Sequence, residues 1–99
     1  MIISGGLNVY PKEIESLIDD LDGVGESAVI GLKDDDLGER VVAVVVRKDK
    51  SVISEEELIA TLKQDIAGFK VPKEVIFVDE LPRNAMGKVQ KNVLRDNYR

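Results

Sequence analysis

Apolar residues near the start of the chain change from an extended to a helical spacing. Two short apolar pieces, 2–3 and 7–9, flank a Ser-Gly-Gly turn at 4–6, which predicts a β-hairpin. Pro11 suits the first position of a helix, where its missing N–H is not needed. The apolar residues after it recur at helical intervals; they are Ile14, Leu17, Ile18 and Leu21. We therefore expect a hairpin and then an amphipathic helix, which the glycines at 23 and 25 end.

Two strongly apolar runs in the middle of the chain predict a pair of strands. Residues 27–32 (SAVIGL) and 41–46 (VVAVVV) are separated by a charged turn, so they should pair in antiparallel fashion. The second run is apolar on both faces. That pattern indicates a strand in the middle of a sheet, covered by helices on at least one side.

A capping signature marks a second helix. Ser54 and Glu57 are spaced as in a capping box, and the apolar positions that follow are Leu58, Leu62 and Ile66. Gly68 is expected to end this helix. Residues 74–81 then read as a further strand, which Pro82 closes.

The predicted order is hairpin, helix, two strands, helix, strand and a C-terminal tail. Helices laid on one small sheet define an α+β fold. We expect a largely antiparallel three-stranded sheet with two amphipathic helices, an N-terminal β-hairpin and a C-terminal loop that carries Lys88. Because the chain has 99 residues and no internal repeat, residues 1–99 are expected to form one domain.

The composition excludes most self-contained chemistry. Cysteine and histidine are absent, which removes disulfides, thiolate nucleophiles, cysteine/histidine zinc sites and the usual acid–base side chain at neutral pH. The first residues lack the basic start and apolar stretch of a signal peptide, and no apolar run approaches the ~20 residues of a membrane span. We therefore expect a cytoplasmic protein without a membrane span.

Charge is distributed unevenly along the chain. A net charge of −5 and a low aromatic content of 4% argue against a nucleic-acid surface. Within residues 81–99 the cations outnumber the single anion, Asp96; they are Arg83, Lys88, Lys91, Arg95 and Arg99. A positive tail on an acidic body suits a small anionic partner.

Two glycine-containing stretches are candidates for ligand contact, but neither is a P-loop. A Walker motif needs glycine and Ser/Thr where this chain has Pro82 and Val89. The turn at 4–6 is either a hairpin turn that needs positive φ or the backbone wall of a ligand channel. The aspartates at 34–36 read as a solvated turn, because the ligand spacing of an EF-hand is absent, and we predict no metal site.

Three lysines near glycine or proline allow two interpretations each. Lys88 follows Gly87 in a loop, where it is either a plain surface cation or a group that meets a phosphate or carboxylate oxygen arriving from outside. Lys70 and Lys73 flank Pro72, where they either snorkel at a helix exit or meet phosphates. The residues alone leave these alternatives open.

Two stretches resemble signature motifs of AMP-forming acyl-CoA synthetases, in the adenylate-forming superfamily. They are MIISGGLNVYPKEIE at 1–15 and DELPRNAMGKVQKNVLR at 79–95. The resemblance covers nearly the whole chain and corresponds to the small C-terminal domain of such enzymes. Within the family, the wording of residues 75–98 looks most like malonyl-CoA synthetases, which implies malonate or methylmalonate as the acid.

The resemblance implies two half-reactions served by one rotating domain. A carboxylate attacks the α-phosphate of ATP to give an acyl-adenylate, and coenzyme A then displaces AMP. ATP and coenzyme A are substrates, and Mg²⁺ would be bound by a large N-terminal domain, so the chain alone should bind no cofactor. Lys88 matches the family's catalytic lysine and would stabilise negative charge where carboxylate and phosphate meet.

The resemblance also implies roles for the N-terminal hairpin. After rotation, Ser4, Gly5 and Gly6 would line the pantetheine channel, and Asn8 matches a position near the nucleotide. Lys70 and Lys73 could meet the phosphates of coenzyme A, on grounds of charge. The hinge and the ATP- and acid-binding domain would precede residue 1, so the chain alone should be inactive. Without that domain to dock on, the lysine loop should be mobile, with low hydrogen-exchange protection across residues 83–92.

Alternative functions remain open at this stage. The basic tail and the missing catalytic groups also suit a non-enzymatic module that binds a protein or an acyl carrier. Another adenylate-forming enzyme, such as a fatty-acid or aryl-CoA ligase, is a further possibility. The spacing of Pro82 and Gly87-Lys88 resembles an acetylation site of acyl-CoA synthetases, so a lysine acetyltransferase is a possible partner that would remove the charge of Lys88.

Overall fold

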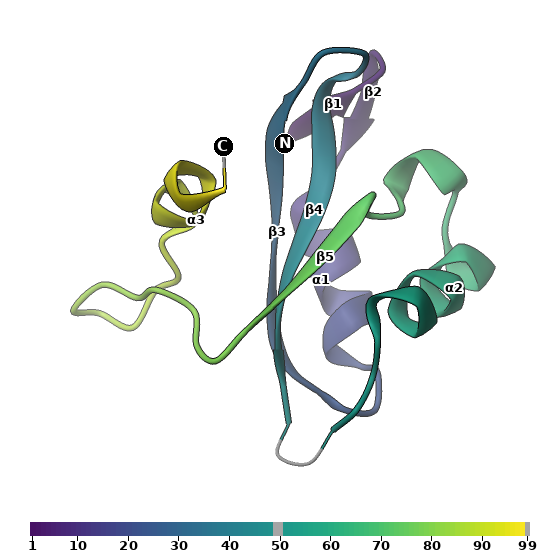
Figure 1. Cartoon of the computed structure of the whole chain (residues 1–99). Coiled ribbons are helices and arrows are strands. Elements are labelled where there is room, and N and C mark those ends of the chain that lie inside the picture. Colours follow the sequence, from purple (N-terminus) through teal and green to yellow (C-terminus); the bar gives the residue numbers. More distant parts are fainter. Residues whose placement is uncertain (49–50, 99) are drawn as a thin grey trace.

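A computed structural model of the chain describes residues 1–48 and 51–98, which form one sheet flanked by helices (Figure 1). In chain order the elements are β1 (Ile2–Ser4), β2 (Leu7–Val9), α1 (Pro11–Asp19), β3 (Val24–Asp34), β4 (Gly38–Arg47), α2 (Glu55–Asp65), the 3-10 turn η1 (Gly68–Lys70), β5 (Glu74–Val78) and α3 (Lys91–Asn97). The predicted α+β class is confirmed. None of the helices in the described ranges is long and apolar enough to cross a bilayer.

The sheet has five strands in place of the three that the sequence predicts. The strand order is β2-β1-β4-β3, and β5 pairs with β4 beside β1. The hairpin joins the sheet through a pairing of Ser4 with Gly38, at the start of β4. The ladders are antiparallel except for β4 with β5, which is parallel. The predicted separate hairpin is thus an extension of the sheet, because β4 begins three residues earlier than its apolar run.

Strand ends differ from the prediction where charged residues continue the ladder. Lys33 and Asp34 still pair with residues of β4, so the turn between the strands is shorter than the charged segment. In the other direction β5 ends at Val78, and the predicted strand to residue 81 is too long. Hydropathy therefore located these strands but not their ends.

Apolar residues fill the space on both faces of the sheet. On one face, α1 and α2 pack the side chains of Ile14 and Leu58 against β4, together with the buried residues Ile18, Val29, Ala43, Val45, Leu62 and Val75. On the other face, Leu81 and Leu94 cover Ala28, Ile30, Val42 and Val44. The prediction that the run 41–46 lies in the middle of the sheet is confirmed, and it is covered from both sides.

The segment after β5 is a structural layer, which corrects the predicted C-terminal tail. Residues 91–97 form α3, in which Leu94 is 2% exposed, and Leu81 is 4% exposed before it. This helix has one fully buried residue, too few for a periodic pattern to reveal. It forms because the second face of β3 and β4 must be covered, a case of tertiary packing stabilising a short helix.

Local signals explain the other two helices. Pro11 occupies the first turn of α1, and the Ser54 hydroxyl accepts a hydrogen bond from the Glu57 N–H at 3.1 Å, so both predicted helix starts are confirmed. α1 ends at Asp19, earlier than Gly23, which the sequence prediction had used as its stop. Gly23 instead has φ +90° in the connection to β3.

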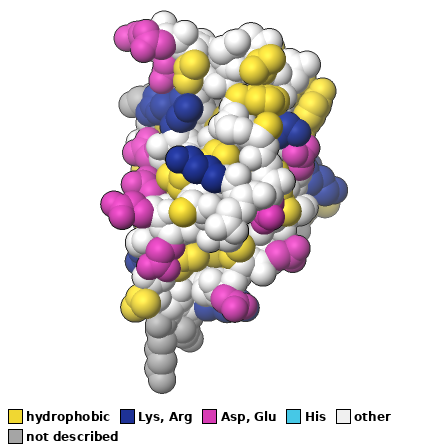
Figure 2. Space-filling model, turned by 90° about the vertical axis from the view of Figure 1, so that its right-hand side faces the viewer, with side chains coloured by type: hydrophobic (Ala, Val, Ile, Leu, Met, Phe, Trp, Pro, Cys, Tyr) yellow, Lys and Arg dark blue, Asp and Glu magenta, His cyan; other side chains and the backbone are white. Residues whose placement is uncertain are grey.

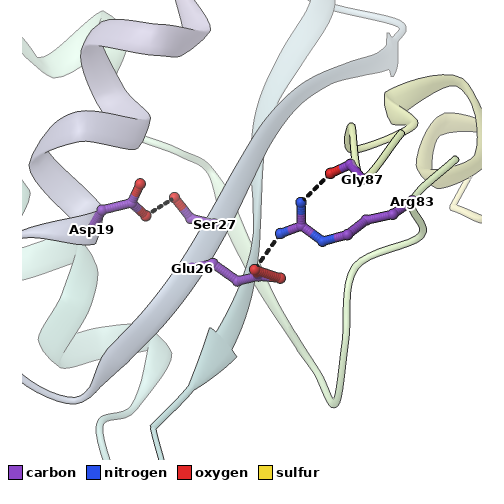
Figure 3. A network of polar contacts seen from close by, with 5 residues as sticks. All are labelled: Asp19, Glu26, Ser27, Arg83 and Gly87. Carbon is purple, nitrogen blue, oxygen red and sulfur yellow. Dashed lines mark hydrogen bonds and ion pairs between the residues drawn. The ribbon is translucent and has the colours of Figure 1, made fainter. Parts of the chain in front are cut away.

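The outer edge of β3 is closed by side chains. Glu15 of α1 accepts a hydrogen bond from the Val29 N–H at 2.8 Å. The same carboxylate forms an ion pair with Lys91 of α3, also at 2.8 Å. Asp19 accepts a hydrogen bond from the Ser27 hydroxyl at 2.7 Å farther along the same strand (Figure 3). These contacts connect the helices of the two faces around the strand edge.

Candidate functional site

The segment 83–89, called the lysine loop below, is a tight turn closed by a bridge between Arg83 and Val89. Gly87 has φ +81°, a conformation that side-chain-bearing residues rarely adopt. Met86 at the tip is 91% exposed, and Lys88 is exposed beside it. The glycine before Lys88 is therefore required by the backbone of the turn.

Asn84 organises the lysine loop from inside. Its side-chain oxygen accepts hydrogen bonds from the N–H groups of Met86 at 2.9 Å and Lys88 at 3.0 Å. Its own N–H donates to the Lys88 carbonyl at 3.0 Å, and its carbonyl accepts from the Gly87 N–H at 2.9 Å. Asparagine favours such local turns because its short amide can reach the backbone two residues on.

Arg83 connects the lysine loop to the sheet (Figure 3). One guanidinium nitrogen donates to the Gly87 carbonyl at 2.7 Å, and the other pairs with Glu26 of β3 at 2.5 Å. Sequence reasoning missed this residue and treated it as one cation of a basic tail. No local pattern could reveal a partner 57 positions away.

Lys88 is exposed on the lysine loop. In the described ranges no group of three or more acidic, cysteine or histidine residues could hold a metal ion. Because Lys88 is exposed and its backbone N–H is hydrogen-bonded to Asn84, it offers a positioned cation to an anionic group that approaches the loop. The predicted mobility of residues 83–92 stays untested, but the hydrogen-bonded amides of Asn84, Gly87 and Gln90 favour slow exchange instead.

The glycine turn at 4–6 is a two-residue hairpin turn. Gly5 and Gly6 have φ +58° and +81°, as turns that match the twist of paired strands require. The Gly5 N–H donates to the Leu37 carbonyl at 2.8 Å. A Cβ added at Gly6 would meet nothing within 4 Å, so this turn presents bare backbone to its surroundings. Ser4 is 6% exposed, at the base of the turn.

A second turn braces the glycine turn. The Leu37 N–H and the Asp36 N–H each donate to the Asp34 carboxylate at 2.9 Å. These two backbone hydrogen bonds, that of Leu37 above all, hold the pKa of Asp34 below its usual value. The aspartates at 34–36 thus build the turn that positions the Leu37 carbonyl.

The two candidate phosphate lysines lie in different settings. The Lys70 ammonium is 2.9 Å from the Glu13 carboxylate, so its charge has a partner within the domain. Lys73 is exposed and lines a pocket of about 280 Å³ together with Lys63 and Gly68. The structure therefore groups Lys73 with Lys63, not with Lys70.

Exposed apolar side chains lie next to the glycine turn. Leu7 of β2 is 48% exposed, Phe69 of η1 is 37% exposed, and β2 contacts η1. Figure 2, which views the side of α2 and η1, shows apolar side chains gathered near its top with basic side chains beside them. Asn8 is exposed on β2, opposite Ile3. This surface suits contact with another surface more than free solvent.

The structure brings the predicted site residues together in two groups. Ser4, Gly5, Gly6 and Asn8 belong to one hairpin, and η1 with Lys70 lies against it. The lysine loop, which carries Lys88, lies apart between β5 and α3, on the other side of β3 and β4 in Figure 1. The described residues therefore provide two candidate surfaces, the glycine turn and the lysine loop.

Residues 13–88 match the family model of the AMP-binding enzyme C-terminal domain. The chain therefore belongs to this family, as its motifs had indicated.

The chain is similar to CoA ligases in sequence and to a solved structure in fold. The chain is 54% identical over 96 residues to a methyl-dioxo-octahydroindenyl-propanoyl:CoA ligase of Rhodococcus jostii, covering 97% of this chain and 19% of the relative. It is 50% identical over 98 residues to a long-chain-fatty-acid–CoA ligase of Mycobacterium tuberculosis, and the match covers 99% of this chain and 19% of that relative. The ATP-bound structure of MatB from Rhodopseudomonas palustris superposes with a TM-score of 0.95 at 60% identity, covering 97% and 19%. The chain thus spans about a fifth of the length of these relatives.

Proposed function

We propose that this chain is the C-terminal domain of an ATP-dependent acid–CoA ligase, which forms an acyl-adenylate and then a coenzyme A thioester. The observation that carries the proposal is the exposed Lys88 on a hydrogen-bonded loop, within a domain of the AMP-binding enzyme family. Relatives that are CoA ligases over nearly the whole chain support it. The rest of the active site would lie in a large N-terminal domain.

In the first half-reaction Lys88 acts as an electrostatic group. A carboxylate oxygen of the acid attacks the α-phosphorus of ATP, the bond to the bridging oxygen breaks, and pyrophosphate leaves. Negative charge gathers on the α-phosphate oxygens as this happens, and a positioned ammonium stabilises it without transferring a proton. Mg²⁺ held by the large domain would balance the charge of the leaving pyrophosphate.

In the second half-reaction the glycine turn faces the active site. The thiol of coenzyme A attacks the acyl carbonyl and AMP leaves. The open space at Gly6 would allow the pantetheine arm to pass closely, with Gly5 beside Leu37, Ser4 at the base of the turn and Asn8 toward the nucleotide. Because the glycine turn and the lysine loop lie apart in the domain (Figure 1), one active site would meet them in turn only if the domain rotates between the two steps.

The phosphates of coenzyme A would meet lysines on the same side as the glycine turn. Lys73 is favoured because it shares a pocket with Lys63. Lys70 would first have to leave Glu13, so its contribution should be smaller.

The acid that is activated would be chosen by the large domain. The sequence of residues 75–98 and the 60% identity to MatB favour malonate or methylmalonate as the acid. The relatives named above carry different acyl groups in their names although they share this domain. We place the enzyme in the cytoplasm, where ATP and coenzyme A are available.

The decisive experiment separates the two half-reactions in the full-length ligase. Lys88→Ala should slow adenylate formation about 100- to 1,000-fold, as expected for removal of one preorganised charge-stabilising group. Thioester formation from supplied acyl-adenylate should remain near normal, because the lysine is turned away in that step. Lys12→Ala, which removes an exposed lysine of α1, is the control and should change neither rate. Equal losses in both half-reactions would reject this division of roles.

Two further ideas from the sequence remain proposals. A carrier-binding module that uses a basic tail is less favoured, because Arg83 and Lys91 pair with Glu26 and Glu15. Acetylation of Lys88 would abolish adenylation by removing its charge, and the side chain is exposed for it. Mass spectrometry that finds Lys88 unmodified after treatment with a lysine acetyltransferase and acetyl-CoA would exclude that regulation.

A further inference from the structure

The peptide bond between Gly87 and Lys88 is held on both sides by side chains. Its carbonyl accepts a hydrogen bond from the Arg83 guanidinium at 2.7 Å, and its N–H donates to the Asn84 side chain at 3.0 Å. Exposed loop peptides usually bond to water. Two side-chain partners on one peptide fix the plane from which the Lys88 side chain projects.

The two partners differ in what they connect. Asn84 belongs to the lysine loop, so its hydrogen bonds define the shape of the turn without tying it to the rest of the domain. Arg83 reaches outward, because its second nitrogen pairs with Glu26. Glu26 lies in β3 and is paired with Val46 of β4, within the longest ladder of the sheet. Through Arg83 and Glu26, the orientation of the Gly87 carbonyl is fixed relative to the sheet.

The base of the loop has other supports. Leu81 and Leu94 are buried against the sheet on either side of it, and Lys91 pairs with Glu15. These contacts hold the two ends of the loop. The Arg83 guanidinium instead reaches the tip, at the carbonyl directly before Lys88, as Figure 3 shows.

We propose that Arg83 is a positioning residue for Lys88, and that its guanidinium sets the direction of the lysine by joining the Gly87 carbonyl to Glu26. This inference rests on the proposed function, in which Lys88 stabilises the adenylation step. A lysine has a flexible four-carbon stem, so the backbone orientation decides which region its ammonium can sample. A displacement of about 1 Å in a catalytic group can slow a reaction about 100-fold.

The competing explanation is a surface ion pair without functional effect. The Arg83 and Glu26 side chains are 43% and 34% exposed, and such pairs contribute about 0–1 kcal/mol to stability. A test must therefore measure the order of the loop and the adenylation rate, and not stability alone. Substitution of Arg83 makes this test possible, because one planar guanidinium donates to two acceptors at once and a different side chain at this position can keep one contact without the other.

Two variants separate the ion pair from the hydrogen bond to Gly87. Arg83→Lys keeps a cation for Glu26 but cannot hold both acceptors in one plane. The exchanged pair, Arg83→Glu with Glu26→Arg, restores opposite charges but leaves position 83 without a donor for the Gly87 carbonyl. Arg95→Lys, on the exposed side of α3, is the matched control.

The first measurement uses the 99-residue chain and does not depend on any enzymatic role. Amide hydrogen exchange at Lys88 should be at least about tenfold faster in Arg83→Lys and in the exchanged pair than in the natural chain or in Arg95→Lys, since a lost contact of about 1.4 kcal/mol is a factor of ten. The melting temperature of both variants should change little. Unchanged exchange at Lys88 would overturn the proposal.

The second measurement uses the full-length ligase. Both variants should lower kcat for adenylate formation about 10- to 100-fold with an unchanged KM for ATP, and should leave thioester formation unchanged. If exchange at Lys88 accelerates but adenylation does not slow, the loop is held by Arg83 without use in catalysis, and the positioning role is rejected. If Lys88→Ala itself leaves adenylation intact, the proposed function fails, whereas the exchange measurement still decides how the loop is held.

Discussion

The glycine turn and the lysine loop are both tight turns with positive φ, but they are held in different ways. The glycine turn connects two strands, and its Gly5 N–H bonds to the backbone of the neighbouring turn at Leu37. The lysine loop also has backbone hydrogen bonds, from Asn84 to Lys88 and from Gly87 to Asn84, but the Arg83 side chain connects its tip to the sheet. The glycine turn thus belongs to the sheet through its strands, whereas the tip of the lysine loop is connected to the sheet by a side chain that a substitution can remove.

This difference has a consequence for how each region responds to change. Backbone hydrogen bonds of the sheet persist under most substitutions, so the glycine turn depends mainly on its own glycines and on the Asp34 turn that braces it. The lysine loop depends on Arg83, Glu26 and the packing of α3, which lie far apart in the sequence. Three substitutions or conditions test this contrast, and the largest effect is expected where packing is removed.

Leu94→Ala should have the largest effect. Leu94 is 2% exposed, and truncation of a buried leucine destabilises a protein by about 2–5 kcal/mol. Because α3 covers the face of the sheet beside the lysine loop, amide exchange at Lys88 should accelerate more than exchange at Gly5. Chemical denaturation gives the loss of stability, and hydrogen exchange gives its distribution. Met86→Ala, at an exposed tip, should change stability by less than about 0.5 kcal/mol.

Equal acceleration at Lys88 and Gly5 in the Leu94 variant would contradict the contrast. It would mean that the two turns open together with the whole domain, as one cooperative unit.

Alanine at Gly6 and at Gly87 should have an intermediate effect that compares the turns directly. Both glycines have φ +81°, and an added Cβ meets nothing within 4 Å at either position. The intrinsic strain is therefore the same, about 1–2 kcal/mol. In the backbone-held glycine turn the full loss should appear in the free energy of unfolding. The lysine loop can relieve part of it by rearranging, so Gly87→Ala should destabilise less.

Gly68→Ala is the control for this pair, since Gly68 has open space and no positive φ. A larger loss at Gly87 than at Gly6 would reverse the ranking of the two turns.

A decrease in pH should have the smallest effect, and we expect it at the glycine turn. The folded-state pKa of Asp34 lies below its ordinary value, so its ionised form stabilises the fold. That contribution is present above the ordinary pKa of about 3.9 and is lost as the pH falls through the lower folded value. Exchange at Gly5, corrected for its intrinsic pH dependence, should then accelerate. NMR titration of the Asp34 carboxyl with a midpoint at or above its ordinary pKa would contradict this.

The sequence predicted the parts of the fold that local signals encode. The Gly5-Gly6 pair revealed the hairpin, the Ser54 and Glu57 spacing revealed the start of α2, and the apolar run 41–46 revealed the central strand. Each signal lies within a few residues of the element that it predicts. The family motifs likewise indicated Lys88 and the glycine turn as site residues, whose roles stay predictions.

The parts that the sequence did not predict depend on distant contacts. α3 contributes one fully buried leucine, and the hairpin joins the sheet through Ser4 and Gly38, which carry no pairing signal. The role of Arg83 depends on Glu26, which is remote in the chain. Such features follow from the assembled sheet, and no reading of nearby residues could provide them.

The carboxylate of Glu15 has one more consequence. An unpaired strand edge is a template on which further strands can add, and natural proteins block it with charge. Glu15 accepts the hydrogen bond of the Val29 N–H at this edge and also pairs with the ammonium of Lys91. A strand of another chain would have to displace the Glu15 carboxylate and the Lys91 side chain. We therefore expect the carboxylate of Glu15 to limit the association of this strand edge with other copies of the chain.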